Sequence, residues 1–336
     1  MPSPIRLGIV GAGAVTQVAH LPVLSRFPEV TVAALADRDL PKAAAVARRH
    51  GIRAAFDDIQ AMLEAVELDA LLIGTPNHLH EVHVLEALGA GLHVLVEKPI
   101  ATSAAGAQRI LKAAAAARRT VLVGMSHRYR HDVATVRGFV QRGELGEVES
   151  VQAVWHTFRP SRGPDNWRLR RAEAGGGAML DLGLSALDMG LWLAGGPTPV
   201  RVSATLDRPL GARGVEQAGC AFVTCDNGAT ILVDVTWRHI GPGERLEVAL
   251  RAAKGSAGVN PLRVWKDVRG TPTDVAPTGA GARENAFTAA VRAEWAHFAA
   301  AVRGKAPAPP LEEQVTLHRV LEAIYRAAAE GCEVTL

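Results

Sequence analysis

Over the first 125 residues, short runs of apolar residues alternate with longer stretches in which apolar residues recur at helical spacing. The apolar runs predict buried strands at Ile5–Val10, Val30–Ala36, Ala70–Gly74, His93–Val96 and Val121–Gly124. The stretches between them predict helices at Val15–Arg26, Leu40–His50, Asp58–Val66, His80–Leu88 and Ser103–Arg118. Strands that alternate with helices in this way predict an α/β domain over residues 1–125, built on a doubly wound parallel sheet.

After Met125 the pattern changes from alternation to strands that follow one another. These strands are predicted at Val148–Phe158, Val200–Leu206, Gln217–Thr224, Ala229–Trp237, Leu246–Arg251 and Leu262–Trp265. Helices are predicted at Asp132–Gln141, Ala178–Leu193, Glu284–Val302 and Leu311–Ala329, and loops at 159–176 and 270–281. Consecutive strands favour an open, mostly antiparallel sheet, so residues 126–336 are expected to form a second α/β domain.

The overall composition is that of an ordinary globular protein, with 48% apolar and 21% charged residues among 336. The net charge of +3 leaves no electrostatic footprint for nucleic acid, and no apolar stretch is long enough to span a bilayer. Three cysteines without a C-x-x-C pair argue against a disulfide framework. We therefore expect a cytoplasmic protein with a small polar molecule as its partner, and neither nucleic acid nor a membrane.

The first predicted strand runs directly into a glycine-rich turn, Gly11-Ala12-Gly13-Ala14-Val15-Thr16, which opens the first predicted helix. Gly11 permits a tight turn, and Gly13 lets a pyrophosphate approach the backbone. The helix N-terminus adds free N–H groups and a positive dipole end. The third small residue of such turns is replaced by Thr16, which weakens the motif but leaves its phosphate-binding part. Gly11, Gly13, Ala14 and Val15 are the expected phosphate contacts.

An acidic residue, Asp37, ends the second predicted strand, 24 positions after Gly13. A carboxylate at this point of a Rossmann domain accepts hydrogen bonds from the adenosine ribose and repels a 2′-phosphate. The sequence therefore predicts NAD as the cofactor. Arg38 follows at once and is able to stack on adenine or tolerate that phosphate, so NADP stays the alternative.

Two further segments follow the third and fourth of the strands predicted in this domain. Loops at the carboxyl ends of parallel strands hold ligands in such sheets, so Thr75, Pro76, Asn77 and His80 are expected near the cofactor. The neighbouring histidines at 78, 80 and 83 also raise the alternative of a metal, but no carboxylate or cysteine cluster accompanies them, and we predict none.

The other segment is Glu97-Lys98-Pro99, in which a lysine stands at the same edge of the sheet as the glycine turn. Only six of the 37 basic residues are lysines, so a lysine at this position is less readily explained as a surface residue without a specific role. A lysine exchanges a proton when burial lowers its pKa, whereas an arginine does not. Taken alone, this segment favours an exposed ion pair at a strand end, with proton exchange by Lys98 as the alternative. A match to a known family would make Glu97 and Lys98 cofactor contacts and Lys98 the catalytic candidate.

Together these segments resemble the Gfo/Idh/MocA oxidoreductases, which include glucose–fructose oxidoreductase and inositol 2-dehydrogenase. The motifs that carry the resemblance are G-A-G-A-V, A-D-R-D, G-T-P-N-H-L-H, A-G-L-H-V-L-V-E-K-P-I-A, G-M-S-H-R-Y, G-G-G-A-M-L-D-L-G and Y-R-A-A-A-E-G. The resemblance runs from about residue 5 to the C-terminus. It implies a substrate-binding and oligomerising C-terminal domain. It also implies reversible hydride transfer between a nicotinamide and a sugar or cyclitol hydroxyl carbon, with Lys98 in the place of the family lysine.

One position departs from the family pattern D-x-G-x-H-x-x-D, in which the histidine is the acid/base partner. Here the segment reads Asp181-Leu182-Gly183-Leu184-Ser185-Ala186-Leu187-Asp188, so a serine replaces the histidine. Asp181, Ser185, Asp188 and Trp192 share one helix face, which is either solvent-exposed or, as the resemblance implies, turned to the pocket. Asp181 and Ser185 are carried forward as catalytic candidates.

A serine is a poor general base near neutral pH, so another group would have to carry the proton. Lys98 itself, His127 and His156 are the candidates, each also plausible as a packing residue. We further expect Lys98, Arg128, His156, Trp167, Arg168 and Asp181 to contact the substrate.

Two functions remain open from the sequence. The leading one is an NAD(P)-dependent oxidoreductase that acts on CH–OH groups of a sugar, cyclitol or similar hydroxy or keto compound. The alternative is a dinucleotide-bound sensor or scaffold without turnover, as in a related fungal transcriptional co-repressor, and Ser185 favours it. In either case the open sheet of residues 148–265 needs a cover, so we expect a homodimer or homotetramer.

Overall fold

A computed structural model describes residues 3–159, 166–207, 214–277 and 285–336, and it divides the chain into two compact units. The first unit comprises Met1–Ser126 and Phe287–Val315, and the second comprises His127–Ala286 and Thr316–Leu336. The expected second domain ran without interruption from 126 to 336. The difference arises because the chain returns to the first unit over residues 287–315.

The first unit contains a six-stranded sheet in which every neighbouring pair of strands is parallel. Across the sheet the order is β3 (Ala54–Phe56), β2 (Val30–Ala36), β1 (Ile5–Val10), β4 (Ala70–Ile73), β5 (His93–Glu97) and β6 (Val121–Gly124). The order reverses its direction between β1 and β4, which is the point where doubly wound sheets bind ligands. The predicted fold class is therefore confirmed for this unit.

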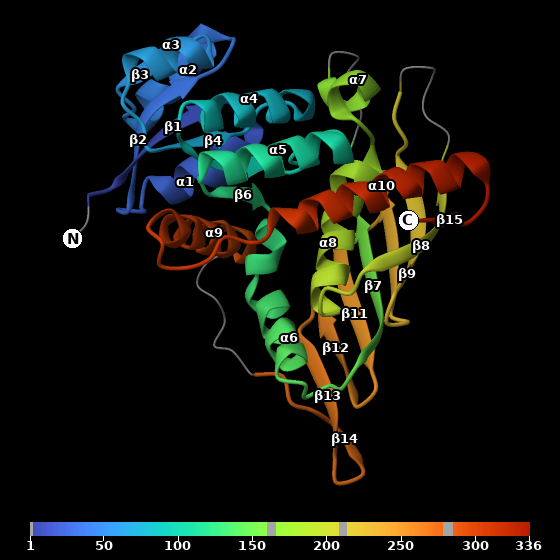
Figure 1. The fold of residues 1–336 in the computed structure, drawn as a ribbon. Coiled ribbons are helices and arrows are strands. Elements are labelled where there is room, and N and C mark those ends of the chain that lie inside the picture. Colours follow the sequence, from blue (N-terminus) through green and yellow to red (C-terminus); the bar gives the residue numbers. More distant parts are fainter. Residues whose placement is uncertain (1–2, 160–165, 208–213, 278–284) are drawn as a thin grey trace. The chain divides into compact units, whose positions relative to one another are not determined.

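Helices cover both faces of this sheet. On one face, the apolar core joins the strands to α1 (Leu21–Leu24), α2 (Leu40–His50) and α9 (Ala286–Val302). On the other lie α3 (Ile59–Ala65), α4 (Asn77–Gly89) and α5 (Ala104–Ala117), of which α4 and α5 run side by side in Figure 1. Trp295 and Phe298 of α9 are fully enclosed, which is why this late helix belongs to the N-terminal core.

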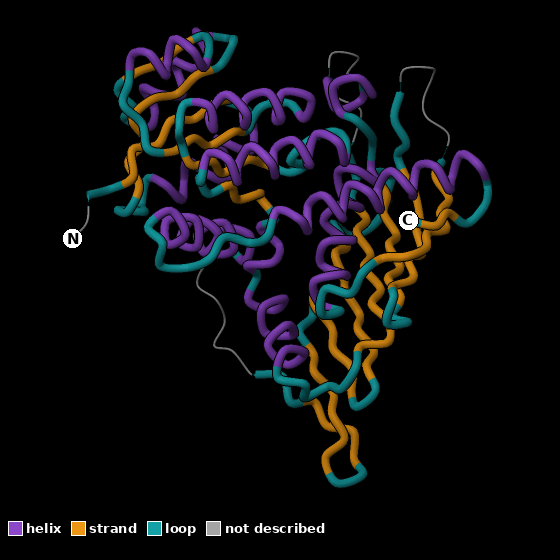
Figure 2. Tube along the Cα trace, viewed as in Figure 1, coloured by secondary structure: helices purple, strands orange, loops and turns teal. Residues whose placement is uncertain are grey.

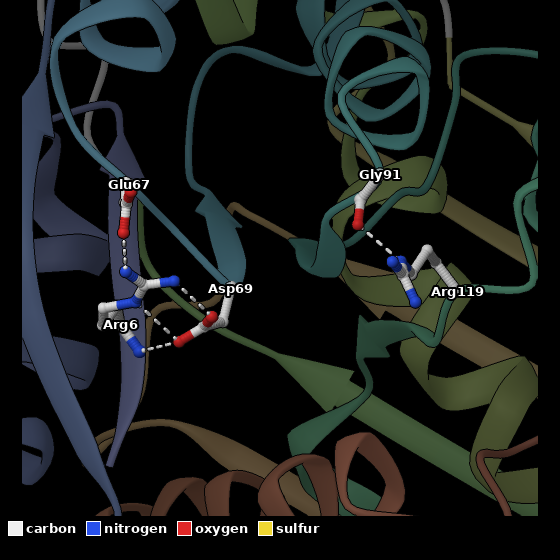
Figure 3. A network of polar contacts seen from close by, with 5 residues as sticks. All are labelled: Arg6, Glu67, Asp69, Gly91 and Arg119. Atoms are coloured by element: carbon white, nitrogen blue, oxygen red, sulfur yellow. Dashed lines mark hydrogen bonds and ion pairs between the residues drawn. The ribbon is translucent and has the colours of Figure 1, made fainter. Parts of the chain in front are cut away.

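An exposed ion-pair network closes the amino-terminal edge of the sheet. Arg6 at the start of β1 donates to both carboxylate oxygens of Asp69, at 3.2 and 2.9 Å, and to Glu67 at 2.6 Å (Figure 3). In the same view, Arg119 donates to the carbonyl of Gly91. The hydrogen bonds from Arg6, which outweigh the opposing effect of burial, lower the pKa of Asp69. This network lies at the opposite strand ends from the glycine turn, so it stabilises the sheet and leaves the carboxyl edge to ligands.

The second unit is built on a nine-stranded sheet, which Figure 2 shows as a continuous set of orange strands. Its order is β14 (Thr271–Asp274), β13 (Arg263–Val268), β12 (Gly255–Val259), β11 (Arg245–Ala252), β7 (Val148–His156), β10 (Thr230–Thr236), β9 (Ala218–Cys225), β8 (Pro199–Leu206) and β15 (Val334–Thr335). Among the strand pairs of this sheet for which the register is described, only β7 and β10 run parallel. The expected open and mostly antiparallel sheet is therefore confirmed.

One face of this sheet packs against helical segments of the same unit. These are α6 (His131–Gln141), the π-helical turn η4 (Met179–Gly183) and α8 (Leu184–Leu193). The remaining helical segments are η1 (Thr16–His20), η2 (Ser126–Tyr129), η3 (Trp167–Leu169), α7 (Arg171–Ala174) and α10 (Leu311–Glu330), of which η1 belongs to the first unit and α10 starts there. Among the described residues, no helix is long and apolar enough to cross a membrane.

Two of the predicted loops need correction. Residues 271–274 form the edge strand β14 instead of a loop, because an edge strand tolerates the proline at position 272. Residues 166–176 contain η3 and α7, whereas 160–165 and 278–281 lie outside the described residues.

Candidate active site

The glycine turn follows β1 at the point where the strand order reverses. Gly11 has a φ of +103°, and a Cβ atom there would lie 2.7 Å from the backbone of Gly74 after β4. The turn therefore requires glycine. At Gly13 a Cβ would meet nothing closer than the Gly74 oxygen, at 3.7 Å. The packing of the chain itself does not demand this second glycine, but the close approach of a pyrophosphate does, so the turn fits a dinucleotide.

Thr16, which replaces the third small residue of the motif, is fully buried at the first position of η1. Its hydroxyl donates to the Gly11 carbonyl at 2.6 Å. A Cβ at Gly74 would lie 2.8 Å from the same hydroxyl oxygen, so the glycine after β4 leaves room for threonine on η1. The departure from the motif is thus compensated locally.

Asp37 is engaged on both carboxylate oxygens by the surrounding chain. Its Oδ2 accepts the Ala12 N–H at 2.8 Å and lies 2.9 Å from the Lys42 ammonium, while Oδ1 accepts the Asp39 N–H at 3.0 Å. Burial alone would raise the pKa of Asp37, but these hydrogen bonds hold it below its ordinary value. Arg38 is exposed beside it. Lys42 is a contact that the sequence analysis missed, since it comes from the next helix.

His80 joins the loop after β4 to the loop after β5. Its Nδ1 lies 2.6 Å from the Pro99 carbonyl and its Nε2 lies 2.8 Å from the Thr75 carbonyl. The ring is buried, and this burial lowers the pKa of His80. Because both ring nitrogens face backbone carbonyls, His80 connects the two loops, and its expected contact with the cofactor stays a prediction.

The other residues of the loop after β4 are more accessible. Thr75, Pro76 and Asn77 are all half-buried, and Asn77 begins α4. The Thr75 hydroxyl lies 3.2 Å from Nδ1 of His83. Within the described residues, no three histidine, cysteine or acidic side chains are arranged to hold a metal ion.

At the end of β5, Glu97 and Lys98 are both half-buried. Glu97 Oε1 lies 2.8 Å from the buried His20 Nε2, and His20 Nδ1 accepts the Trp295 N–H at 3.1 Å. Burial alone would raise the pKa of Glu97, but the hydrogen bond from His20, with the charge of Lys98 nearby, holds it below its ordinary value. The carboxyl edge of this sheet thus carries the glycine turn, Asp37 and Lys98 together.

In the second unit, Asp181 lies on η4 and is partly exposed. Its Oδ2 accepts the indole N–H of Trp237 at 3.2 Å and forms an ion pair with Arg159. Ser185, by contrast, is only 3% exposed. Of the polar stripe expected on this helix, Asp181 is therefore the member best placed to meet a ligand.

Asp188 and Arg128 form a bidentate ion pair, with nitrogen–oxygen distances of 2.7 and 2.5 Å. The Arg128 guanidinium also lies 5.7 Å from the centre of the Trp192 ring. Arg128, which was expected to contact the substrate, thus ties the segment after β6 to α8. No local sequence pattern predicts this pairing, because the two residues lie 60 positions apart.

His156 points away from the helices that pack on this sheet. Side chains alternate along β7, and Trp155 points to the sheet face that carries η4 and α8, where it packs edge-on against His127 at 4.7 Å. His156 therefore points to the opposite face, where its Nε2 lies 3.1 Å from Asp234. It does not lie on the sheet face that carries Asp181, and its expected substrate contact stays a prediction.

Trp167 and Arg168 of η3 are half-buried, and the Arg168 guanidinium lies 4.4 Å from the centre of the Trp167 ring. The turn before η4 is held by Glu216, which the sequence analysis also missed. Glu216 Oε1 accepts the N–H groups of Gly177 and Met179 at 2.8 and 3.1 Å and the Tyr325 hydroxyl at 2.8 Å. This buried carboxyl explains why a glycine run and a distant tyrosine accompany the helix that carries Asp181.

The 3-2-1-4-5-6 parallel sheet, its glycine turn and an acidic residue after β2 are the features of a dinucleotide-binding domain. Residues 5–125 match the oxidoreductase family with an NAD-binding Rossmann fold, and residues 133–256 match the GFO/IDH/MocA C-terminal domain. The chain belongs to this family, as the motifs in the sequence implied.

Three relatives illustrate the match. The chain is 30% identical to D-xylose 1-dehydrogenase (NADP(+)) 2 of Haloferax volcanii, over 98% of this chain and 99% of that protein. It is 26% identical to D-glucoside 3-dehydrogenase of Escherichia coli K12, over 99% and 98%. The crystal structure of GenD2 from gentamicin A biosynthesis, in complex with NAD, is 27% identical with a TM-score of 0.85, over 100% of this chain and 97% of that one.

Proposed function

We propose that this enzyme transfers a hydride between a nicotinamide dinucleotide and a hydroxyl-bearing carbon of a sugar or related polyol. The relatives named for xylose and glucoside dehydrogenation support this substrate class. The observation that carries the proposal is the shared carboxyl edge of the first sheet, where the glycine turn, Asp37 and Glu97-Lys98 follow three strands of one parallel sheet, β1, β2 and β5. Bound NAD supplies the hydride acceptor at its nicotinamide ring.

In the oxidative direction the reacting carbon loses a hydride to the nicotinamide, and its hydroxyl oxygen loses a proton. We assign that proton to the neutral amine of Lys98, which becomes an ammonium and returns the proton in the reverse direction. Asp181, fixed by the Trp237 indole, is assigned to a substrate hydroxyl. Ser185 is buried, so it is assigned to the shape of the helix around Asp181 instead of to proton transfer.

The test begins with a panel of sugars and cyclitols followed by nicotinamide absorbance. On one confirmed substrate, Lys98→Ala should lower kcat by about 10²–10⁴-fold and leave NAD affinity within a few-fold, as expected for loss of an acid/base group. Lys98→Arg should fail almost as badly, because arginine keeps its charge but does not release its proton.

Lys112→Ala on the exposed side of α5 is the matched control and should behave as the wild type. Full activity in Lys98→Arg would remove Lys98 from the mechanism. Absence of turnover on every polyol, with NAD still bound, would favour a sensor instead of an enzyme of this substrate class.

We also propose that the protein is a cytoplasmic homo-oligomer that associates through the sheet of its second unit. On the face opposite α8, one row of side chains crosses five strands and includes the apolar Phe222 and Leu232. Phe222 is 43% exposed there. An apolar face of this kind supports association with a second copy.

A further inference from the structure

Arg159, which follows β7, contacts Asp181 of η4 and Trp237, which follows β10. Its guanidinium forms an ion pair with Oδ2 of Asp181 through Nη1. The same oxygen accepts the Trp237 indole N–H at 3.2 Å, and the guanidinium carbon of Arg159 lies 5.9 Å from the centre of the Trp237 ring. All three residues belong to the second unit, so the cluster is defined within that unit.

The backbone around this ion pair is held in place, while the charged groups stay accessible. The Arg159 N–H donates to the Trp237 carbonyl at 2.8 Å, and the Asp181 N–H donates to the Gly177 carbonyl at 2.8 Å. Trp237 is only 4% exposed, whereas the side chains of Arg159 and Asp181 are 41% and 21% exposed. An ion pair this exposed contributes little to stability, so a ligand explains the arrangement better than the fold does.

The two charged groups present opposite hydrogen-bonding roles side by side. A carboxylate only accepts hydrogen bonds, whereas a guanidinium only donates them, through several N–H groups in a planar fork. A sugar hydroxyl both donates and accepts, so two adjacent hydroxyls satisfy the two groups at once. The pair has no net charge, and the carboxylate of Asp181 would repel an anionic ligand that approached Arg159. This chemistry fits an uncharged diol.

We propose that Arg159 and Asp181 bind two neighbouring hydroxyl groups of an uncharged sugar, with Arg159 as the donor and Asp181 as the acceptor. Arg159 is therefore a specificity-determining residue, and the substrate class narrows to sugars or cyclitols that carry a vicinal diol and no charged group. The inference rests on the proposed function, in which Asp181 is assigned to a substrate hydroxyl.

Calorimetric titration of the protein loaded with NADH measures sugar binding without turnover, because NADH accepts no hydride from an alcohol. The probes are D-glucose, D-xylose and myo-inositol. Arg159→Met removes the donors while it keeps most of the length of the side chain. It should weaken the sugar that binds about ten- to a hundredfold, the value of a hydrogen bond to a charged group. Arg159→Lys keeps a charged donor without the fork, so it should recover part of that loss.

Monodeoxy analogues of the sugar that binds show whether Arg159 acts through one particular hydroxyl. One analogue should bind the wild type about as weakly as the parent sugar binds Arg159→Met. The same analogue should bind Arg159→Met with no further loss of affinity, because both changes remove the same hydrogen bond.

Arg238→Met is the matched control. Arg238 follows Trp237 in the chain and is also exposed, but it forms its ion pair with Asp207, at 2.7 Å, so this variant should leave sugar affinity unchanged. Equal sugar affinities in wild type and Arg159→Met would overturn the proposal. So would a loss that is the same for the parent sugar and every deoxy analogue, since that result shows a structural effect. Tighter binding of gluconate or glucose 6-phosphate than of glucose would overturn the uncharged class and make Arg159 an anion contact.

Kinetics then separate this inference from the proposed function. On a confirmed substrate, Arg159→Met should raise KM more than it lowers kcat, since it removes binding that the ground state and the transition state share. If sugars are turned over but Arg159→Met keeps the wild-type KM, the inference fails and the proposed function stands. If a sugar binds in the expected pattern but exchanges no hydride, the inference stands and the proposed reaction fails. If no sugar or cyclitol of the panel binds, both fail.

Discussion

The carboxylate of Asp37, which we propose as a cofactor contact, is held by hydrogen bonds and an ion pair within the protein itself. Because the Ala12 and Asp39 N–H groups and the Lys42 ammonium hold its two oxygens, the carboxylate is fixed in direction before a ribose arrives. Lys42 places a positive charge 2.9 Å from the Asp37 carboxylate. At the scale of single residues, we therefore propose that cofactor preference depends on both Asp37 and Lys42.

We expect wild type to bind NAD more tightly than NADP. Asp37→Ala should weaken NAD roughly ten- to a hundredfold, the value of hydrogen bonds to a charged group, and should narrow the gap to NADP because a repulsive charge is lost. Isothermal titration calorimetry with both dinucleotides measures this difference.

Lys42→Ala is the matched variant, since it leaves Asp37 in place but removes its counter-charge. It should weaken NADP more than NAD. If the wild type binds NADP clearly more tightly than NAD, the predicted preference is wrong. Arg38 and Lys42 would then be the residues that determine cofactor binding.

Single residues also show where sequence reasoning stops. The places of Gly11 and Asp37 were predicted because a turn and a strand end fix them locally. His156 was expected to contact the substrate, and it lies on the sheet face opposite the one that carries Asp181. Alternation along a strand shows that neighbouring side chains point to opposite faces, but it does not show which face the helices cover. The His20 contact with Glu97 spans 77 positions, and no local pattern predicts such a pair.

At the scale of elements, the start of η4 depends on one buried carboxyl. Glu216 accepts three donors on a single oxygen, and burial raises its pKa. A Cβ at Gly177 would lie 1.8 Å from the Glu216 carbonyl, and one at Gly176 would lie 2.0 Å from the Tyr325 hydroxyl. The two glycines thus allow the start of η4 to contact Glu216, just before β9, and Tyr325 of α10.

Tyr325→Phe removes the hydroxyl donor to Glu216 while it retains the ring. We expect it to destabilise the protein by about 1–3 kcal/mol, the usual cost of an unsatisfied buried polar group. Thermal unfolding at pH 7 measures this as a lower melting temperature. Because the dinucleotide loops belong to the first unit, NAD affinity should not change.

Arg326→Ala, on the exposed side of the same helix, is the control and should change stability by no more than about 0.5 kcal/mol. A Tyr325→Phe protein as stable as this control would show that Glu216 needs no donor from α10.

The elements themselves were predicted wherever apolar runs are long and uninterrupted. All five strands predicted in the first 125 residues are present, because a buried parallel strand is apolar on both faces. Gly255–Val259 was missed, since its sequence Gly-Ser-Ala-Gly-Val lacks both β-branched bulk and clear alternation. Its pairing with β11 and β13 makes it a strand, and that information is not local.

At the scale of the whole molecule, the division into units depends on contacts that are not local in the sequence. The change of pattern near residue 125 marks one boundary, and the last residue of the first segment is Ser126. The return of α9 to the first unit depends on Trp295 and Phe298, whose apolar pattern is equally compatible with packing on either unit. A helix shows which of its faces is buried, but not the partner that buries it.

The proposed assembly is the remaining test at this scale. The row Ser203, Phe222, Leu232, Gln152 and Ala249 crosses β8, β9, β10, β7 and β11 on the face opposite α8. If two copies cover this face, a charge at its centre should separate them, since burial of an unpaired carboxylate is costly. We expect light scattering at micromolar concentration to give a dimer or tetramer for wild type and a smaller species for Phe222→Asp. Val82→Asp on α4 is the matched control, because Val82 is also 43% exposed but belongs to the first unit, and it should leave the molar mass unchanged. A wild-type monomer would refute the assembly. An oligomer that survives Phe222→Asp but not Val82→Asp would move the interface to the first unit.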